Sequence, residues 1–95
     1  MFYFVDMATP REAIDDDEKE HLRARLLELP AGRARFFLRD GSTLVGSVAR
    51  EHNSNAVDAD GRWRISAGVT LALEGGASRF LDLLDVTRIE ALLPN

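Results

Sequence analysis

The apolar positions of the chain follow a helical period up to residue 30 and a period of two beyond it. Leucines at helical spacing predict one amphipathic helix over residues 16–29, whose apolar face is made of Leu22, Leu26, Leu27 and Leu29. Pro30-Ala31-Gly32 ends this helix. Two starts fit the sequence, a capping box at residues 9–12 and the acidic residues 15–18.

Residues 33–94 are expected to form only strands. Asp40-Gly41 predicts a tight turn between a strand over 33–39 and one that begins at Leu44. Gly46 predicts a sharp bend in that second strand, because a glycine inside a strand permits bending or the close approach of another backbone. Further turns are expected at residues 52–55, 60–61 and 75–76.

The later strands follow from the same alternation. The third strand lies at either 55–59 or 69–74, and the last two are expected at 80–84 and 89–93. We therefore predict a mainly β fold with one N-terminal α-helix, arranged as a small, bent, antiparallel barrel of five to six strands. One domain would cover residues 1–95, with its three parts at 1–8 (an extended apolar N-terminus), 9–30 (helical) and 33–94 (the barrel).

Two segments of the strand region resemble a known family. Residues 38–46, Leu-Arg-Asp-Gly-Ser-Thr-Leu-Val-Gly, are similar to the first motif of the Sm-like family, which includes the Sm proteins and the bacterial RNA chaperone Hfq. Residues 86–94 resemble the family's last turn and closing strand. The resemblance covers roughly residues 16–94, is nearest to short uncharacterised bacterial proteins with variant Sm-like folds, and implies an Sm-like barrel fold.

The RNA-binding positions of that family differ in this chain. Family members that bind RNA carry an aspartate and an asparagine six and ten residues after the second glycine, where this chain has His52 and Ala56. Asn53 and Asn55 lie close to those positions and are kept as nucleic-acid candidates. The family's arginine-glycine pair corresponds here to Asp82-Leu83, and a carboxylate repels phosphate.

The best candidate for nucleic-acid binding is one face of the first strand, formed by Arg33, Arg35, Phe37 and Arg39. Three guanidinium groups and an aromatic ring on one face can pair with phosphates and stack on bases. A competing interpretation places the acidic helix over this face, where the arginines would pair with Glu18, Glu20 or Glu28.

Composition narrows the function classes. The chain has no cysteine and only two histidines, which excludes disulfides, thiolate metal sites and cysteine nucleophiles. A net charge of −4 makes it a poor general binder of phosphate backbones. We find no catalytic, metal or cofactor signature and no membrane-spanning run, so the expected protein is a non-enzyme in the cytoplasm. His52 is read as a histidine in a surface turn, without a partner.

Exposed aromatic residues indicate self-association. The residues assigned to an oligomer interface are Phe2, Tyr3, Phe4 and Trp63. A homodimer is expected in preference to a hexamer or heptamer, because residues 52–67 interrupt the region that would close a ring and two-fold contacts are the commonest. The predicted function is a non-enzymatic Sm-like interaction module that self-associates; the alternative is a weak RNA-binding protein.

Overall fold

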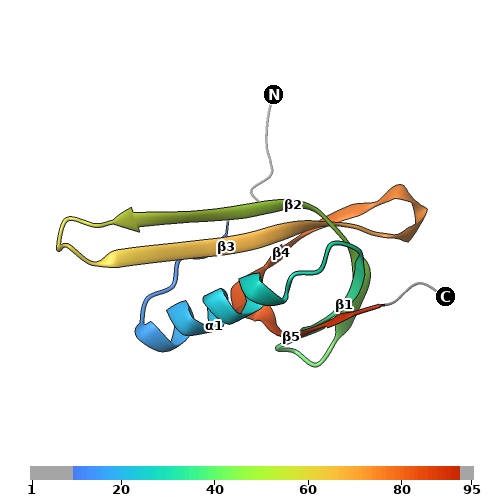
Figure 1. The fold of residues 1–95 in the computed structure, drawn as a ribbon, viewed down its shortest axis with the longest axis horizontal. Helices are drawn as coiled ribbons and strands as arrows, with labels where there is room; N and C mark the ends of the chain where they lie inside the picture. Colours follow the sequence, from blue (N-terminus) through green and yellow to red (C-terminus); the bar gives the residue numbers. More distant parts are fainter. Residues whose placement is uncertain (1–9, 93–95) are drawn as a thin grey trace.

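The computed structural model describes residues 10–92, which form one α-helix and a five-stranded sheet (Figure 1). In chain order the elements are α1 (Asp16–Glu28), β1 (Arg33–Leu38), β2 (Thr43–Val57), β3 (Trp63–Ala72), the 3-10 turn η1 (Glu74–Gly76), β4 (Ser78–Asp82), the 3-10 turn η2 (Leu83–Asp85) and β5 (Val86–Ala91). The sheet is antiparallel throughout, in the order β4-β3-β2-β1-β5.

Helix α1 begins at the second of its two expected starts. The Asp15 side chain accepts a hydrogen bond from the Glu18 N–H at 2.8 Å, and the Glu18 carboxylate accepts one from the Ile14 N–H at 2.9 Å. These bonds satisfy N–H groups that a helix start leaves without partners. Residues 10–13 lie instead along the edge of β3, where the Ala13 N–H donates to the Ile65 carbonyl at 2.8 Å. The Thr9 cap lies outside the described residues.

The apolar face of α1 is narrower than expected. Leu22 is fully buried, and Leu26 and Leu29 pack against the core. Leu27 is 89% exposed, so its assignment to the buried face is wrong. It lies one residue after Leu26 in the sequence, about 100° further around the helix, which carries it away from the sheet.

The β2–β3 hairpin differs most from the sequence-based expectation. The predicted turn at residues 52–55 is absent, because β2 continues to Val57 and pairs with β3 from Ser47 to its end. The turn lies at residues 58–62, and Gly61 has the positive φ of 80° that favours glycine. The third strand is Trp63–Ala72, so the option at 55–59 is wrong and the option at 69–74 captures only its second half.

β2 changes its pairing partner at Ser47, directly after Gly46, where the sequence predicts a bend. Residues 43–47 of β2 pair with β1, and from Ser47 onward the strand pairs with β3. A Cβ atom at Gly46 would lie 2.7 Å from the Ala72 carbonyl oxygen, which shows how closely the curled sheet approaches itself there. Figure 1 shows β2 curving away from β1 into the long hairpin.

The sheet is strongly bent but open, so the predicted barrel is not confirmed. β4 and β5 are the two edge strands and do not pair with each other. A cavity of about 450 Å³ lies between β4 and the end of β1. The core lies between the sheet, α1 and η2, and consists of Ala13, Leu22, Ala34, Phe36, Ile65, Ala67, Val69, Leu71, Leu81, Leu83, Leu84 and Val86.

Candidate functional site

The predicted basic face of β1 points away from the core, as the alternation indicated. Ala34 and Phe36 are fully buried, while Arg33, Arg35 and Phe37 lie on the opposite side of the strand. This arrangement follows from the period of two in a strand. The structure therefore brings three of the four predicted residues to one surface.

The arginines of that surface are paired with acidic side chains. Arg33 pairs with Glu74 at 3.1 Å, and Arg35 pairs with Glu90 at 3.1 Å. Arg88 also bonds Glu90, at 2.9 Å, and its guanidinium lies 4.9 Å from the centre of the Phe37 ring. The arginines are thus paired as the competing interpretation held, but with carboxylates of the sheet and its turns.

The helix carboxylates proposed as partners make other contacts. Glu28 pairs with Arg25 and Glu20 with Arg23, both within α1. Glu18 bonds the Ile14 N–H at the helix start. The prediction that α1 covers the basic face is wrong, because α1 packs on the other side of the sheet, against β3, β5 and η2.

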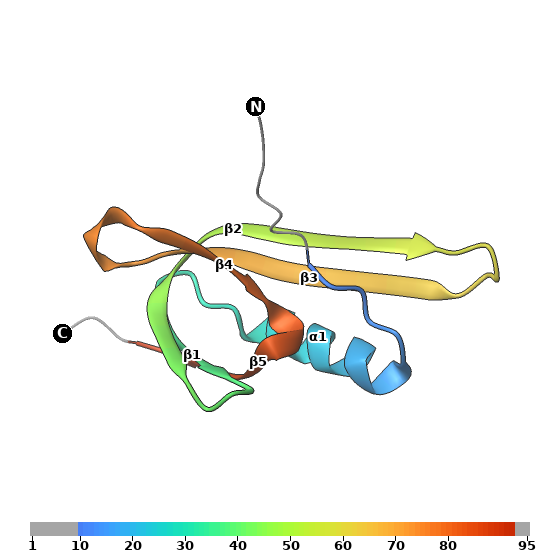
Figure 2. The same ribbon diagram turned by 180° about the vertical axis from the view of Figure 1, so that it is seen from behind.

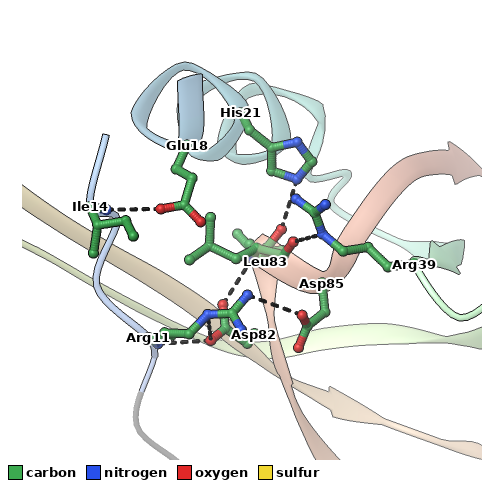
Figure 3. A network of polar contacts seen from close by, with 9 residues as sticks. Arg11, Ile14, Glu18, His21, Arg39, Asp82, Leu83 and Asp85 are labelled. Atoms are coloured by element: carbon green, nitrogen blue, oxygen red, sulfur yellow. Dashed lines mark hydrogen bonds and ion pairs between the residues drawn. The ribbon is translucent and has the colours of Figure 1, made fainter. Parts of the chain in front are cut away.

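Arg39, the fourth predicted residue, belongs to a different group. Its Nε–H donates to the Leu84 carbonyl in η2, so the side chain braces this turn (Figure 3). The imidazole of His21, from α1, lies 3.2 Å from the neighbouring Leu83 carbonyl. Two side chains from distant elements thus hold η2 in place.

Asp82 fixes the same turn from the other side. Its carboxylate accepts hydrogen bonds from the Leu84 N–H at 2.9 Å and from the Arg11 N–H at 2.8 Å, and the side chain is 14% exposed. The Arg11 guanidinium reaches Asp85 at 3.1 Å (Figure 3). Asp82 corresponds to the phosphate-binding arginine of the Sm-like family. In this chain it is therefore a carboxylate whose contacts are structural.

Asn53 and Asn55 lie far from the basic face in the fold. They are opposite Ala67 and Ile65 in the β2–β3 ladder, so their side chains are on the helix side of the sheet. Asn55 lines a cavity of about 380 Å³ together with Trp63 and side chains of α1. The six nucleic-acid candidates are thus divided between the two sides of the sheet.

Trp63 is prominent at the tip of the hairpin. It is 58% exposed, and Val57, its partner in the ladder, is 53% exposed. Trp63 also lines a second cavity of about 630 Å³ that extends toward Ile14 and Asp15 at the start of α1. The other predicted interface residues, Phe2, Tyr3 and Phe4, lie outside the described residues.

His52 has partners that its sequence context did not indicate. It lies within β2, its Nε2 is 2.9 Å from the Thr70 hydroxyl, and its ring meets the Phe80 ring edge-to-face at 5.7 Å. The Phe80 ring covers Gly68, where a Cβ atom would lie 2.6 Å from it. The prediction of an unpartnered turn histidine is wrong, and no local signal in the sequence reveals this cross-strand cluster.

Asp58 organises the hairpin turn. Its carboxylate accepts hydrogen bonds from the Arg62 N–H and the Arg64 guanidinium, and these contacts lower the pKa of Asp58 and raise that of Arg64. Such bonds favour the charged carboxylate. Asp58 therefore stabilises the turn at residues 58–62, which includes the turn predicted at residues 60–61.

Residues 10–92 contain neither a metal-binding cluster nor a membrane-spanning helix. No group of three or more histidine and carboxylate side chains is arranged to hold a metal ion within this part of the chain. The helix found there is also too short and too polar to cross a membrane.

No known protein family and no curated protein matches this sequence. Among solved structures, the fold is similar to that of XC5848 from Xanthomonas campestris, which is described as adopting a novel variant of Sm-like motif. The TM-score is 0.69 at 17% identity, and the match covers 88% of this chain and 95% of XC5848. The likeness concerns the fold, and it agrees with the strand and turn pattern of residues 38–46 and 86–94: this chain has a variant Sm-like fold.

Proposed function

We propose that this protein is a non-enzymatic interaction module that associates with a second copy of itself. The observation that carries the proposal is the exposure of Trp63 and Val57 side by side at the hairpin tip. Exposed apolar groups of this size are typical of protein contact sites.

The surroundings of Trp63 favour a protein partner. Trp63 is 58% exposed and lines two cavities, of about 630 and 380 Å³. Full burial of one such side chain contributes roughly 1.5–3 kcal/mol before the entropy of association is subtracted. Phe2, Tyr3 and Phe4 would add to the same interface, in keeping with a dimer.

Sedimentation velocity across a concentration series tests this proposal. We expect a dimer, and we expect Trp63→Ser to shift it toward monomer. Leu27→Ser is the matched control, because Leu27 is even more exposed but lies on the outer side of α1. Deletion of residues 1–7 should also weaken the dimer. A wild-type protein that stays monomeric at high micromolar concentration would refute the proposal.

Weak RNA binding is the second candidate, and the surface of β1 and β5 supports it. Arg33, Arg35 and Arg88 lie on the same surface as Phe37, and among residues 10–92 the carboxylates paired with these three cations are Glu74 and Glu90. Binding through this surface would be no tighter than micromolar and would weaken as salt rises. Fluorescence anisotropy with a uridine-rich oligonucleotide should show loss of binding in Arg35→Glu. Nanomolar affinity that survives this change would contradict the assignment of the surface.

A further inference from the structure

The second half of β2 has an open edge. β1 pairs with β2 only at residues 43–47, and β3 occupies the opposite edge as far as Val57. No residue between 10 and 92 pairs with the remaining edge of β2. Both ribbon views show β2 as the outer border of the hairpin (Figures 1 and 2).

The register determines which residues face this edge. The Asp58 N–H donates to the Arg62 carbonyl at 2.9 Å, in the same register that pairs Val57 with Trp63. Bonded and non-bonded pairs alternate along an antiparallel ladder. The backbone N–H and C=O groups of residues 51, 53, 55 and 57 therefore point outward, away from β3.

Apart from Glu51 at its start, this edge lacks the features that prevent strand pairing. Residues 52–57, His-Asn-Ser-Asn-Ala-Val, contain no proline, lysine or acidic residue. Natural edge strands are commonly protected by such residues, by a bulge or by a covering element. The irregular position in β2 falls between Val48 and Arg50, before this stretch, which leaves residues 51–57 regular and straight.

We propose that β2 of a second copy pairs antiparallel with this edge, about a two-fold axis at Ser54, so that two sheets become one. This proposal rests on the self-association proposed above and assigns it a contact along the β2 edge, in which Val57 takes part and Trp63 lies one strand behind. A two-fold axis perpendicular to the sheet makes the contact self-complementary. With Ser54 on the axis, all outward-facing residues of the regular stretch pair: Glu51 with Val57 of the second copy, and Asn53 with Asn55.

The charges agree with this register. No like charges are opposed: Glu51 faces an apolar residue, and Arg50 faces Asp58 of the second copy. Within the described part of the chain Arg50 forms no ion pair. Val57, 53% exposed in the single chain, would be covered by the neighbouring strand.

Cysteine cross-linking tests the axis directly, because the chain contains no cysteine of its own. Ser54 would form a non-bonded pair across the axis, with Cα atoms about 4.5 Å apart, a separation that a disulfide bridges. Ser54→Cys should therefore give a cross-linked dimer under mild oxidation. Ser78→Cys, on the open edge of β4, is the control and should remain largely uncrosslinked.

A charge pair at position 57 provides an independent test. Val57→Glu places a carboxylate opposite Glu51 of the other copy at two symmetric positions, whereas Val57→Lys places an ammonium there. Both variants remove the same apolar side chain. The dimer dissociation constant from sedimentation should be at least about fivefold higher for the glutamate variant.

The outcomes distinguish pairing through the β2 edge from self-association through another surface. A dimer that cross-links through Ser78→Cys and not Ser54→Cys would overturn the β2 edge but leave self-association standing. Equal dissociation constants for the two Val57 variants would likewise overturn it. A monomeric wild-type protein at high micromolar concentration would overturn both proposals.

Discussion

Gly46 provides the sharpest test of how the sheet is bent. An alanine at this position would place its Cβ atom 2.7 Å from the Ala72 carbonyl oxygen and 3.1 Å from a Leu73 methyl carbon. Real Cβ atoms essentially never approach a backbone atom that closely, so β2 or β3 must shift. The φ of Gly46 is not in the left-handed region, which means that the cost arises from packing alone.

We expect Gly46→Ala to lower the free energy of unfolding by about 1–3 kcal/mol, the usual range for overpacking a close contact. Gly46→Val should cost at least as much. Urea denaturation measures the change, and for a chain of this length 1 kcal/mol corresponds to a melting shift of roughly 4–8 °C.

Gly32→Ala is the matched control. A Cβ atom there meets nothing within 4 Å, and its φ is not positive. Because alanine restricts the unfolded chain more than glycine does, this variant should be neutral or stabilised by roughly 0.4–1 kcal/mol. If Gly46→Ala and Gly32→Ala unfolded at the same urea concentration, β2 would not approach β3 as described.

Three further predictions concern the sheet and its turns. Asp82→Ala should lower the free energy of unfolding in urea by about 1–3 kcal/mol, because two backbone N–H groups lose their acceptor. Asp85→Ala is the control: its side chain is 51% exposed, so the free energy of unfolding should change by less than about 0.5 kcal/mol. Gly68→Ala should be tolerated better in a Phe80→Leu background than alone, since the ring is what its Cβ atom meets, and a double-mutant cycle measures the difference. The pKa of Asp58 lies below its usual value of 3.8, so the stability that Asp58 contributes is present above pH 3.8 and is lost as the pH falls through the lower pKa of the folded state. NMR titration of the Asp58 carboxyl group measures this pKa. An ordinary value would contradict the described hydrogen bonds of the turn.

Local signals in the sequence predicted much of the fold. The leucine spacing and the acidic start identified α1, and Asp40-Gly41 and Gly75-Gly76 marked turns that the structure contains. These features depend on conformational preferences of adjacent residues, which a sequence displays directly. Gly46 belongs to the same class, because its missing side chain marks a close approach.

Two errors, the turn at residues 52–55 and the bounds of the third strand, arise from the pairing of β2 with β3. Residues 52–55, His-Asn-Ser-Asn, favour turns by composition, yet each lies opposite a residue of β3, and the Ser54 and Ser66 hydroxyls are 2.9 Å apart. Cross-strand contacts of this kind outweigh the weak preferences of single residues.

The candidate site was predicted less well than the fold. The alternation placed Arg33, Arg35 and Phe37 on one face correctly, but not the partners of those arginines. Glu90 meets Arg35 only because β1 and β5 pair in this register, and Glu74 reaches Arg33 from the turn after β3. Such ion pairs depend on the order and register of the strands in the sheet, which the spacing of residues along the chain does not reveal.

The alternating orientation of peptide groups along β2 has a consequence for amide hydrogen exchange. In a single chain the N–H groups of residues 52, 54 and 56 are bonded to β3, while those of 51, 53 and 55 face solvent. Exchange rates along this segment would therefore alternate between slow and fast with a period of two. Any strand that pairs with the open edge would slow the odd-numbered amides alone and leave the even-numbered ones unchanged.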